Sequence, residues 1–261
     1  MSVPSFTVLG DGPTVLMLHG VGGGHLAFAP QVETLASSGY RAVAWDMPGY
    51  GRSPPIEPYN FKGLAQSCAA LIEGLNCGDV TLLGHSMGGM VAQEVAARRP
   101  ELVNKLILCG TSPAFGKPDG PWQRNFMAER TAALDAGKSM AQLAQLLVPR
   151  MVGPGSLPEG VRLATHCMSL VPASTYRRAL EAMLAFDRRA ELPRIRVPTL
   201  VVAGEHDRSA PPAVMKKMAD LIAHSTYLQM RGIGHLQNLE APDDFDTLVL
   251  NFLALPPALL H

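Results

Sequence analysis

The chain has 261 residues, a length that fits one compact domain with room for an inserted subdomain. Hydrophobic residues make up 47% of it and charged residues 17%, which is enough apolar content for a large core. Lysine plus arginine and aspartate plus glutamate balance at 22 each, without a basic stripe, so the composition argues against a nucleic-acid partner and favours a small-molecule ligand.

The N-terminal stretch lacks the basic start and apolar centre of a signal peptide, and no apolar run reaches the roughly 20 residues that a membrane-spanning helix needs. The four cysteines, Cys68, Cys77, Cys109 and Cys167, have no paired spacing, so we interpret them as buried thiols. These features predict a cytoplasmic protein without a membrane partner. We interpret the 13 methionines as core residues, with an adaptable apolar pocket as the alternative.

Short apolar runs alternate with helical patterns along most of the chain, which is typical of a mostly parallel sheet with crossover helices. Strands are predicted at 14–18, 42–45, 80–83, 105–109, 199–203 and 226–228. Apolar residues at spacings of three and four predict helices around 32–36, ended by Gly39, around 64–75, and at 245–252, preceded by Pro242 and two acidic residues.

The alternation stops between about residue 111 and residue 195, where helical patterns occur at 128–147, 161–168 and 176–186. A single crossover connection needs far fewer residues than this. We therefore predict a helical cap at 111–195, inserted between a first part of an α/β core at 1–110 and a second part at 196–261. A long crossover is the alternative.

The most informative motif is G-x-S-x-G at residues 84–88, directly after an apolar strand. A serine hydroxyl is a poor nucleophile unless it is exposed, oriented and deprotonated during attack. This motif forms a sharp turn from strand to helix that lifts the serine out of the sheet, and the glycines allow close packing. The N-terminus of the following helix would also favour developing negative charge. We predict Ser86 as the nucleophile, with a common glycine-rich turn as the alternative.

The partners of such a serine follow in the chain order serine, acid, histidine. Asp207 and His235 each follow an apolar strand, so both would lie at carboxyl ends of strands, where open α/β sheets place their sites. We predict His235 as the base and Asp207 as the acid that orients it. Glu205 is the alternative acid, and His85 is expected to pack against the turn rather than to replace His235.

An oxyanion hole needs two backbone donors. We predict the amide of Met87, directly after the nucleophile, and that of Val21, or Gly22 as second choice, in the glycine-rich loop at 19–25. A flexible turn before a helix is the alternative for this loop. It does not match a dinucleotide or phosphate-binding motif, and no Cys/His cluster suggests a metal site, so we expect neither a cofactor nor a metal ion.

Five segments together resemble the α/β-hydrolase superfamily along nearly the whole core. They are His19-Gly20, the segment DMPGYGRS at 46–53, GHSMGG at 84–89, GEHD at 204–207 and GIGH at 232–235. The resemblance implies the α/β-hydrolase fold, with a mostly parallel central sheet flanked by helices and an inserted helical cap, and a serine hydrolase with a Ser-His-Asp triad. It implies little about the substrate, because one fold hosts many functions.

Within the superfamily, the chain looks most like 3-oxoadipate enol-lactonases and related hydrolases of aromatic catabolism. This likeness includes Trp122 and Arg124, the segment at 185–207 and the segment at 235–245. Those lactonases often carry leucine where this chain has His85 and serine where it has Gln237. We predict that Trp122 and Arg124, at the cap entry, bind the substrate. The indole of Trp122 would form an apolar wall, and the guanidinium of Arg124 would bind a substrate carboxylate. A solvated surface charge is the alternative for Arg124.

The sequence thus predicts cleavage of an ester or lactone, enol-lactones included, through an acyl-enzyme. A carbon–carbon bond hydrolase of ring-fission dienones, a cofactor-free perhydrolase and a ligand receptor with slow turnover are the alternatives. The predicted partner is a small-molecule substrate, and the oligomeric state is left open.

Overall fold

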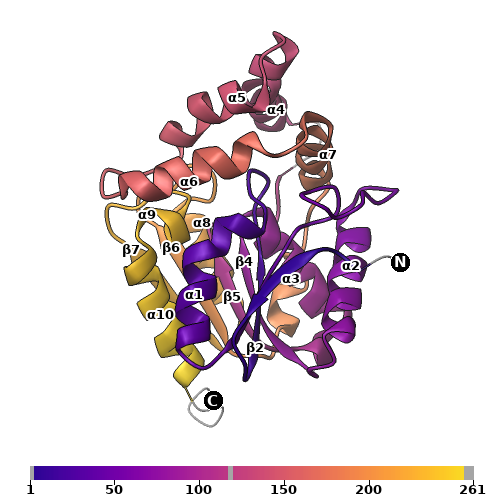
Figure 1. The fold of residues 1–261 in the computed structure, drawn as a ribbon, viewed down its shortest axis with the longest axis vertical. Helices are drawn as coiled ribbons and strands as arrows, with labels where there is room; N and C mark the ends of the chain where they lie inside the picture. The colour runs from indigo at the N-terminus through magenta and orange to yellow at the C-terminus, as the bar shows by residue number, and fades with distance from the viewer. Residues whose placement is uncertain (1–2, 117–119, 256–261) are drawn as a thin grey trace.

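The computed structural model describes residues 3–116 and 120–255. Residues 1–2 and 256–261 of the predicted core and residues 117–119 of the predicted cap lie outside the described residues. Within the described part, seven strands form one sheet in the order β1-β3-β2-β4-β5-β6-β7 (Figure 1). The strands are β1 (Phe6–Leu9), β2 (Thr14–Leu18), β3 (Arg41–Trp45), β4 (Val80–His85), β5 (Val103–Cys109), β6 (Thr199–Gly204) and β7 (Ser225–Met230). Neighbouring strands run parallel, except that β1 is antiparallel to β3.

The predicted strands are confirmed as β2 to β7, with ends shifted by up to two residues. β2, β4 and β6 are buried along their whole length, which explains why they read as continuous apolar runs rather than as alternating ones. β1 is only four residues long and lies at the sheet edge with all of them exposed, and the sequence prediction missed it.

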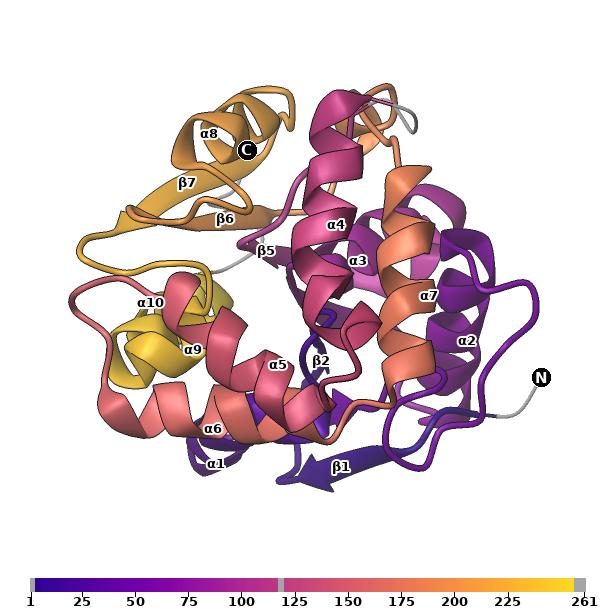
Figure 2. The ribbon, with the colours of Figure 1, turned by 90° about the horizontal axis from the view of Figure 1, so that it is seen from above.

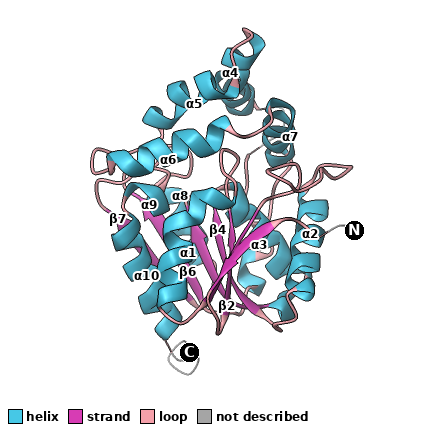
Figure 3. Ribbon diagram, viewed as in Figure 1, coloured by secondary structure: helices cyan, strands magenta, loops and turns pink. Residues whose placement is uncertain are grey.

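Helices cover both faces of the sheet (Figure 3). α1 (Ala29–Ser37) and α10 (Pro242–Ala254) contact each other on one face, whereas α2 (Phe61–Gly74), α3 (Met87–Arg98) and α8 (Pro212–Asp220) pack on the other. Successive strand residues point to opposite faces, so Leu82 packs in the core beneath α2 and α3 and Leu83 in the core beneath α1 and α10. α1, α2 and α10 agree with the predicted helices, whereas α8 and the short α9 (Gln237–Glu240) lie outside them.

Between β5 and β6 the chain forms α4 (Pro121–Asp135), α5 (Met140–Leu147), α6 (Pro158–Ser169) and α7 (Ala173–Leu184). Figures 1 and 2 show these helices lying across one end of the sheet, with α4 beside α7 and α5 beside α6. We keep the division into a core (1–110 and 196–261) and a cap (111–195) as a proposal. Among the described residues, no helix is both long enough and apolar enough to span a membrane.

One prediction for the cap is wrong. The expected single helical run at 128–147 is two helices, because Gly137 adopts a φ of 79° and ends the first. Ser139 then begins α5 with a capping box, in which its side chain accepts from the Gln142 amide and the Gln142 side chain accepts from the Ser139 amide. The predicted helices at 161–168 and 176–186 are present as α6 and α7.

Candidate active site

Ser86 occupies the turn between β4 and α3 in a conformation that residues other than glycine rarely adopt, with φ 53° and ψ −119°. Two hydrogen bonds hold the turn: the Ser86 amide donates to the Cys109 carbonyl (2.9 Å), and the Thr111 hydroxyl donates to the Ser86 carbonyl (2.7 Å). A Cβ atom on Gly88 would collide with the Leu18 carbonyl, so only glycine lets α3 approach β2 this closely. The turn presents Ser86 to a cavity.

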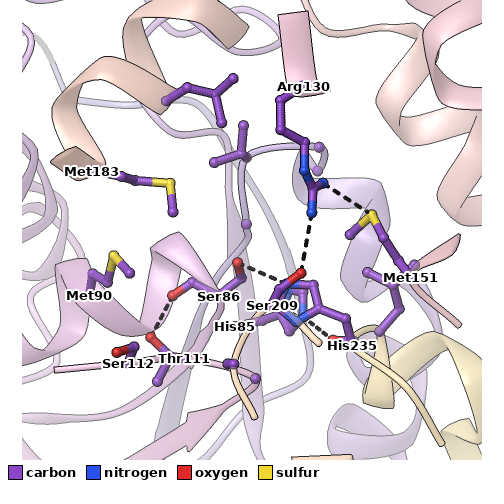
Figure 4. Close-up of a pocket in the computed structure, with 18 of the residues that line it drawn as sticks. His85, Ser86, Met90, Thr111, Ser112, Arg130, Met151, Met183, Ser209 and His235 are labelled. Carbon is purple, nitrogen blue, oxygen red and sulfur yellow. Dashed lines mark hydrogen bonds between the residues drawn. The ribbon is translucent and has the colours of Figure 1, made fainter. Parts of the chain in front are cut away.

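The structure brings together Ser86, His235 and Asp207. His235 Nε2 lies 3.1 Å from Ser86 Oγ, and His235 Nδ1 lies 2.8 Å from Asp207 Oδ2 (Figure 4 shows the Ser86–His235 contact). The second carboxylate oxygen of Asp207 accepts from the amides of Ser209 (2.8 Å) and Ala210 (2.9 Å). Asp207 follows β6 and His235 follows β7, so both side chains come from the carboxyl ends of strands.

The environment of Asp207 keeps its carboxyl group ionised. Burial by itself raises its pKa, but the interactions with His235 and the hydrogen bonds from Ala210 and Ser209 outweigh burial and leave the pKa below the ordinary value of 3.8. The alternative acid is placed differently: the Glu205 side chain is 44% exposed, and it accepts from the Gly232 amide at 2.8 Å. Asp207 is therefore the acid in position to orient His235.

His85 lies directly before Ser86 and is buried. Its Nε2 donates to the backbone carbonyl of His235 at 2.7 Å (Figure 4), which makes the ring a support for the loop that carries His235. Burial and the nearby His235 lower the pKa of His85 to about 3, so the ring is neutral at pH 7. In this position His85 packs beside the turn and does not take the place of His235.

The predicted oxyanion donors flank the nucleophile. Met87 is the first residue of α3, and Val21 and Gly22 line the cavity that contains Ser86. A Cβ atom added to Gly20 would lie 3.0 Å from Ser86 Cβ, so the loop backbone passes close to the nucleophile. The Tyr50 hydroxyl donates to the Val21 carbonyl at 2.9 Å and helps to fix this loop.

The cavity beside Ser86 has a volume of about 480 Å³ and extends beneath the cap helices. Methionines from the core and the cap contribute to its wall, which agrees with the alternative interpretation of the methionine-rich sequence. They are Met90, Met151, Met168 and Met183. An apolar cavity with a few polar groups at one end is typical of small-molecule sites.

The cap contributes one face of α4 to this cavity. Trp122, Phe126 and Arg130 follow each other at intervals of four residues, so they share a face, and all three line the cavity. Trp122 is half-exposed and stacks on Phe126 with ring centroids 5.4 Å apart. Arg124 is exposed and does not line the cavity, because it follows Trp122 by two residues and so lies about 200° around the helix from it.

Arg130, rather than the predicted Arg124, places its guanidinium at the wall of the cavity. Its Nη2 donates to Ser209 Oγ at 3.2 Å, its Nη1 donates to Met151 Sδ at 3.6 Å, and its guanidinium lies 5.0 Å from the centre of the Phe126 ring (Figure 4). The spacing from Trp122 to Phe126 to Arg130 was the available signal, since helical periodicity places the three on one face.

Two further residues of the site have no counterpart among the predicted site residues. The Gln237 amide nitrogen donates to the Gly234 carbonyl at 3.0 Å and approaches Asp207 Oδ2 at 3.5 Å. Glu240 is fully buried beneath the loop that carries His235. Within residues 3–116 and 120–255, no group of three or more His, Cys, Asp or Glu side chains is arranged to hold a metal ion.

The sequence of the chain matches a known protein family. The alpha/beta hydrolase fold family matches residues 13–242. The chain belongs to this family. It is 29% identical over 255 residues to a Pseudomonas syringae protein named "Putative carbamate hydrolase RutD", and the match covers 95% of this chain and 96% of that one.

A second relative is 3-oxoadipate enol-lactonase 2 of Acinetobacter baylyi, 31% identical over 214 residues that cover 80% of this chain and 77% of the lactonase. Among solved structures, an esterase of Exiguobacterium antarcticum superposes with a TM-score of 0.86 at 27% identity, over 95% of each chain. The family and these relatives identify the chain as a hydrolase that acts on small molecules.

Proposed function

We propose that the chain cleaves an ester or lactone through an acyl-enzyme on Ser86. The observation that carries this proposal is the continuous hydrogen-bonded series from Ser86 Oγ through the His235 ring to Asp207 Oδ2, at 3.1 and 2.8 Å. His235 accepts the Ser86 proton as Oγ attacks the carbonyl carbon, and it returns that proton to the leaving oxygen. A water molecule then attacks the acyl-enzyme, His235 takes its proton, and the acid product leaves as Ser86 regains a proton.

The negative charge that develops on the carbonyl oxygen needs donors fixed in advance. We assign this role to the amides of Met87 and Val21. Met87 opens α3, so its amide belongs to the positive end of that helix, and Val21 lies in the loop that passes over Ser86. Losing one such donor typically costs about 3 kcal/mol of transition-state stabilisation.

The cap suggests which acyl or alcohol groups are accepted. Arg130 is half-buried, and among residues 3–116 and 120–255 it contacts the neutral groups of Ser209, Met151, Phe126 and Tyr176 and forms no ion pair. A guanidinium at a cavity wall, with no carboxylate partner in the described part of the chain, is suited to an anionic group of the ligand.

We therefore propose a substrate with a carboxylate that Arg130 binds and an apolar part that rests against Trp122 and Phe126. For Arg124, the cavity wall offers no such role.

Carbamate cleavage is the second candidate, because the RutD likeness spans 95% of the chain and a carbamate carbonyl can be attacked by the same serine. A steady-state screen separates the candidates. It should include neutral and carboxylate-bearing esters, an enol-lactone of a dicarboxylate, matched carbamates and a ring-fission dienone. The expected result is the highest kcat/KM for a carboxylate-bearing ester or lactone. A preference for carbamates or for the dienone would replace the proposal, and binding without turnover would favour a receptor.

A further inference from the structure

Glu240 ends the short helix α9, five residues after His235, and its side chain is fully buried. Its two carboxylate oxygens accept four hydrogen bonds. Oε2 accepts from the amides of Gly153 and Gly234, both at 2.7 Å, and from the Ser156 hydroxyl at 2.6 Å. Oε1 accepts from the Leu236 amide at 2.7 Å.

These donors are neutral, and no lysine or arginine among the described residues forms an ion pair with Glu240. A buried charge is costly unless hydrogen bonds replace its hydration, which the four donors do here. Because a buried charge contributes little to overall stability compared with an apolar residue of the same size, a role in fixing local geometry accounts better for Glu240.

The local geometry in question is that of His235. Gly234 and Leu236, whose amides bind Glu240, stand on either side of it in the chain. The His235 amide itself donates to the Met151 carbonyl at 2.7 Å, and its carbonyl accepts from His85 at 2.7 Å. The backbone of residues 234–236 is thus held at four polar groups around His235, two of them by the same carboxylate.

The other two donors to Glu240 belong to the cap. Gly153 and Ser156 lie in the segment between Arg150 and α6, and the Gly155 amide donates to the Gly232 carbonyl at 2.8 Å. A Cβ atom on Gly234 would collide with the Met151 carbonyl, so the two backbones meet without a side chain between them. The same carboxylate therefore joins the cap segment at 151–156 to the loop that carries His235.

We propose that Glu240 is a positioning residue, whose buried carboxylate holds the cap segment at 151–156 and the backbone on both sides of His235 in one arrangement and so keeps the imidazole in line with Ser86. The inference rests on the proposed role of His235 as the base. In Glu240→Gln, the amide replaces one acceptor oxygen by a donor, so at least one of the four N–H or O–H groups faces another donor and the His235 loop shifts.

The test measures how fast an excess of a fluorophosphonate labels Ser86, with the rate constant separated from the final extent of labelling. Glu240→Gln should lower the rate constant by about 10- to 100-fold, the effect expected from a misplacement of about 1 Å. Glu205→Gln is the matched control, because it also removes a carboxylate that accepts from this loop, at the Gly232 amide, but on the exposed side. It should leave the rate constant within about twofold of the parent value.

A purely structural role would lower the melting temperature and the extent of labelling but not the rate constant of the folded molecules. That result, or equal rate constants in Glu240→Gln and Glu205→Gln, would overturn the inference. If Glu240→Gln does not fold, Glu240→Asp keeps the charge but withdraws it by one methylene, and the same drop in rate constant is expected. Failure of the unaltered protein to react at Ser86 would instead overturn the proposed function.

Discussion

Ser86, Asp207 and His235 are placed by backbone turns at the ends of strands, whereas Trp122 and Arg130 are placed by their spacing along one helix. The turns are fixed by close backbone contacts and by main-chain hydrogen bonds, which set the direction of each side chain. On α4, the direction of a side chain depends on whether its position lies on the face of the helix that lines the cavity. Under the proposed function, the core loops carry the chemistry and the cap helix carries selectivity.

The largest expected effect lies at the nucleophile. Ser86→Ala should lower kcat by roughly 10⁴-fold or more, because no acyl-enzyme forms, while the fold is retained. Turnover of the best ester from the screen, together with the melting temperature, checks this. A variant that keeps a tenth of the activity would show that the core loops do not carry the chemistry.

The next effect separates the two candidate acids. Asp207→Asn should lower kcat/KM on the order of 10³- to 10⁴-fold, because the amide favours the wrong tautomer of His235 and cannot stabilise its charged form. Glu205→Gln should change kcat/KM little, since its carboxylate is partly exposed and bonds to the Gly232 amide. Similar losses in both variants would mean that the acid is misassigned.

The next effect concerns the cap residues on α4. Arg130→Ala should raise KM for a carboxylate-bearing substrate by about tenfold or more, the usual effect of losing a hydrogen bond to a charged group, and should hardly change that for a neutral short ester. Arg124→Ala, on the opposite face of the same helix, should leave both unchanged. Equal changes in KM for the two substrates would reject anion recognition by Arg130.

The smallest expected effect concerns pH and the buried histidines of the core. Burial lowers the pKa of His85 to about 3 and that of His19 to about 4, so below pH 6.5 the unfolded chain binds protons that the folded chain does not. Stability is therefore lost as the pH falls from 6.5 towards these values. The groups that act on His85 are His235, Asp207 and His19.

His85→Gln keeps a donor for the His235 carbonyl but cannot be protonated. Its free energy of unfolding should fall less steeply between pH 6.5 and 4.5, by up to about 1.4 kcal/mol per pH unit. Urea unfolding at a series of pH values measures this slope. Parallel slopes for the variant and the parent protein would contradict a neutral, buried His85.

Features that depend on contiguous residues could be predicted from the sequence, whereas features that depend on distant contacts could not. β2 to β7 and the turn at Ser86 are encoded in contiguous residues, as apolar runs and as G-x-S-x-G, so local patterns identify them. β1 is a four-residue edge strand whose residues are all exposed, and the break at Gly137 interrupts an otherwise helical pattern. Glu240 is recognisable only in three dimensions, because most of its partners are main-chain amides, two of its four donors lie more than 80 residues away, and such amides leave no trace in the sequence.

In the proposed mechanism, Ser86 is the nucleophile and His235 is its base. Reaction of the purified protein with a fluorophosphonate, followed by peptide mapping, tests this most directly, because it depends on no assumed substrate. We expect the label to form on Ser86 and its rate of formation to fall sharply in His235→Ala. A label on another serine, or an unchanged rate in His235→Ala, would contradict it.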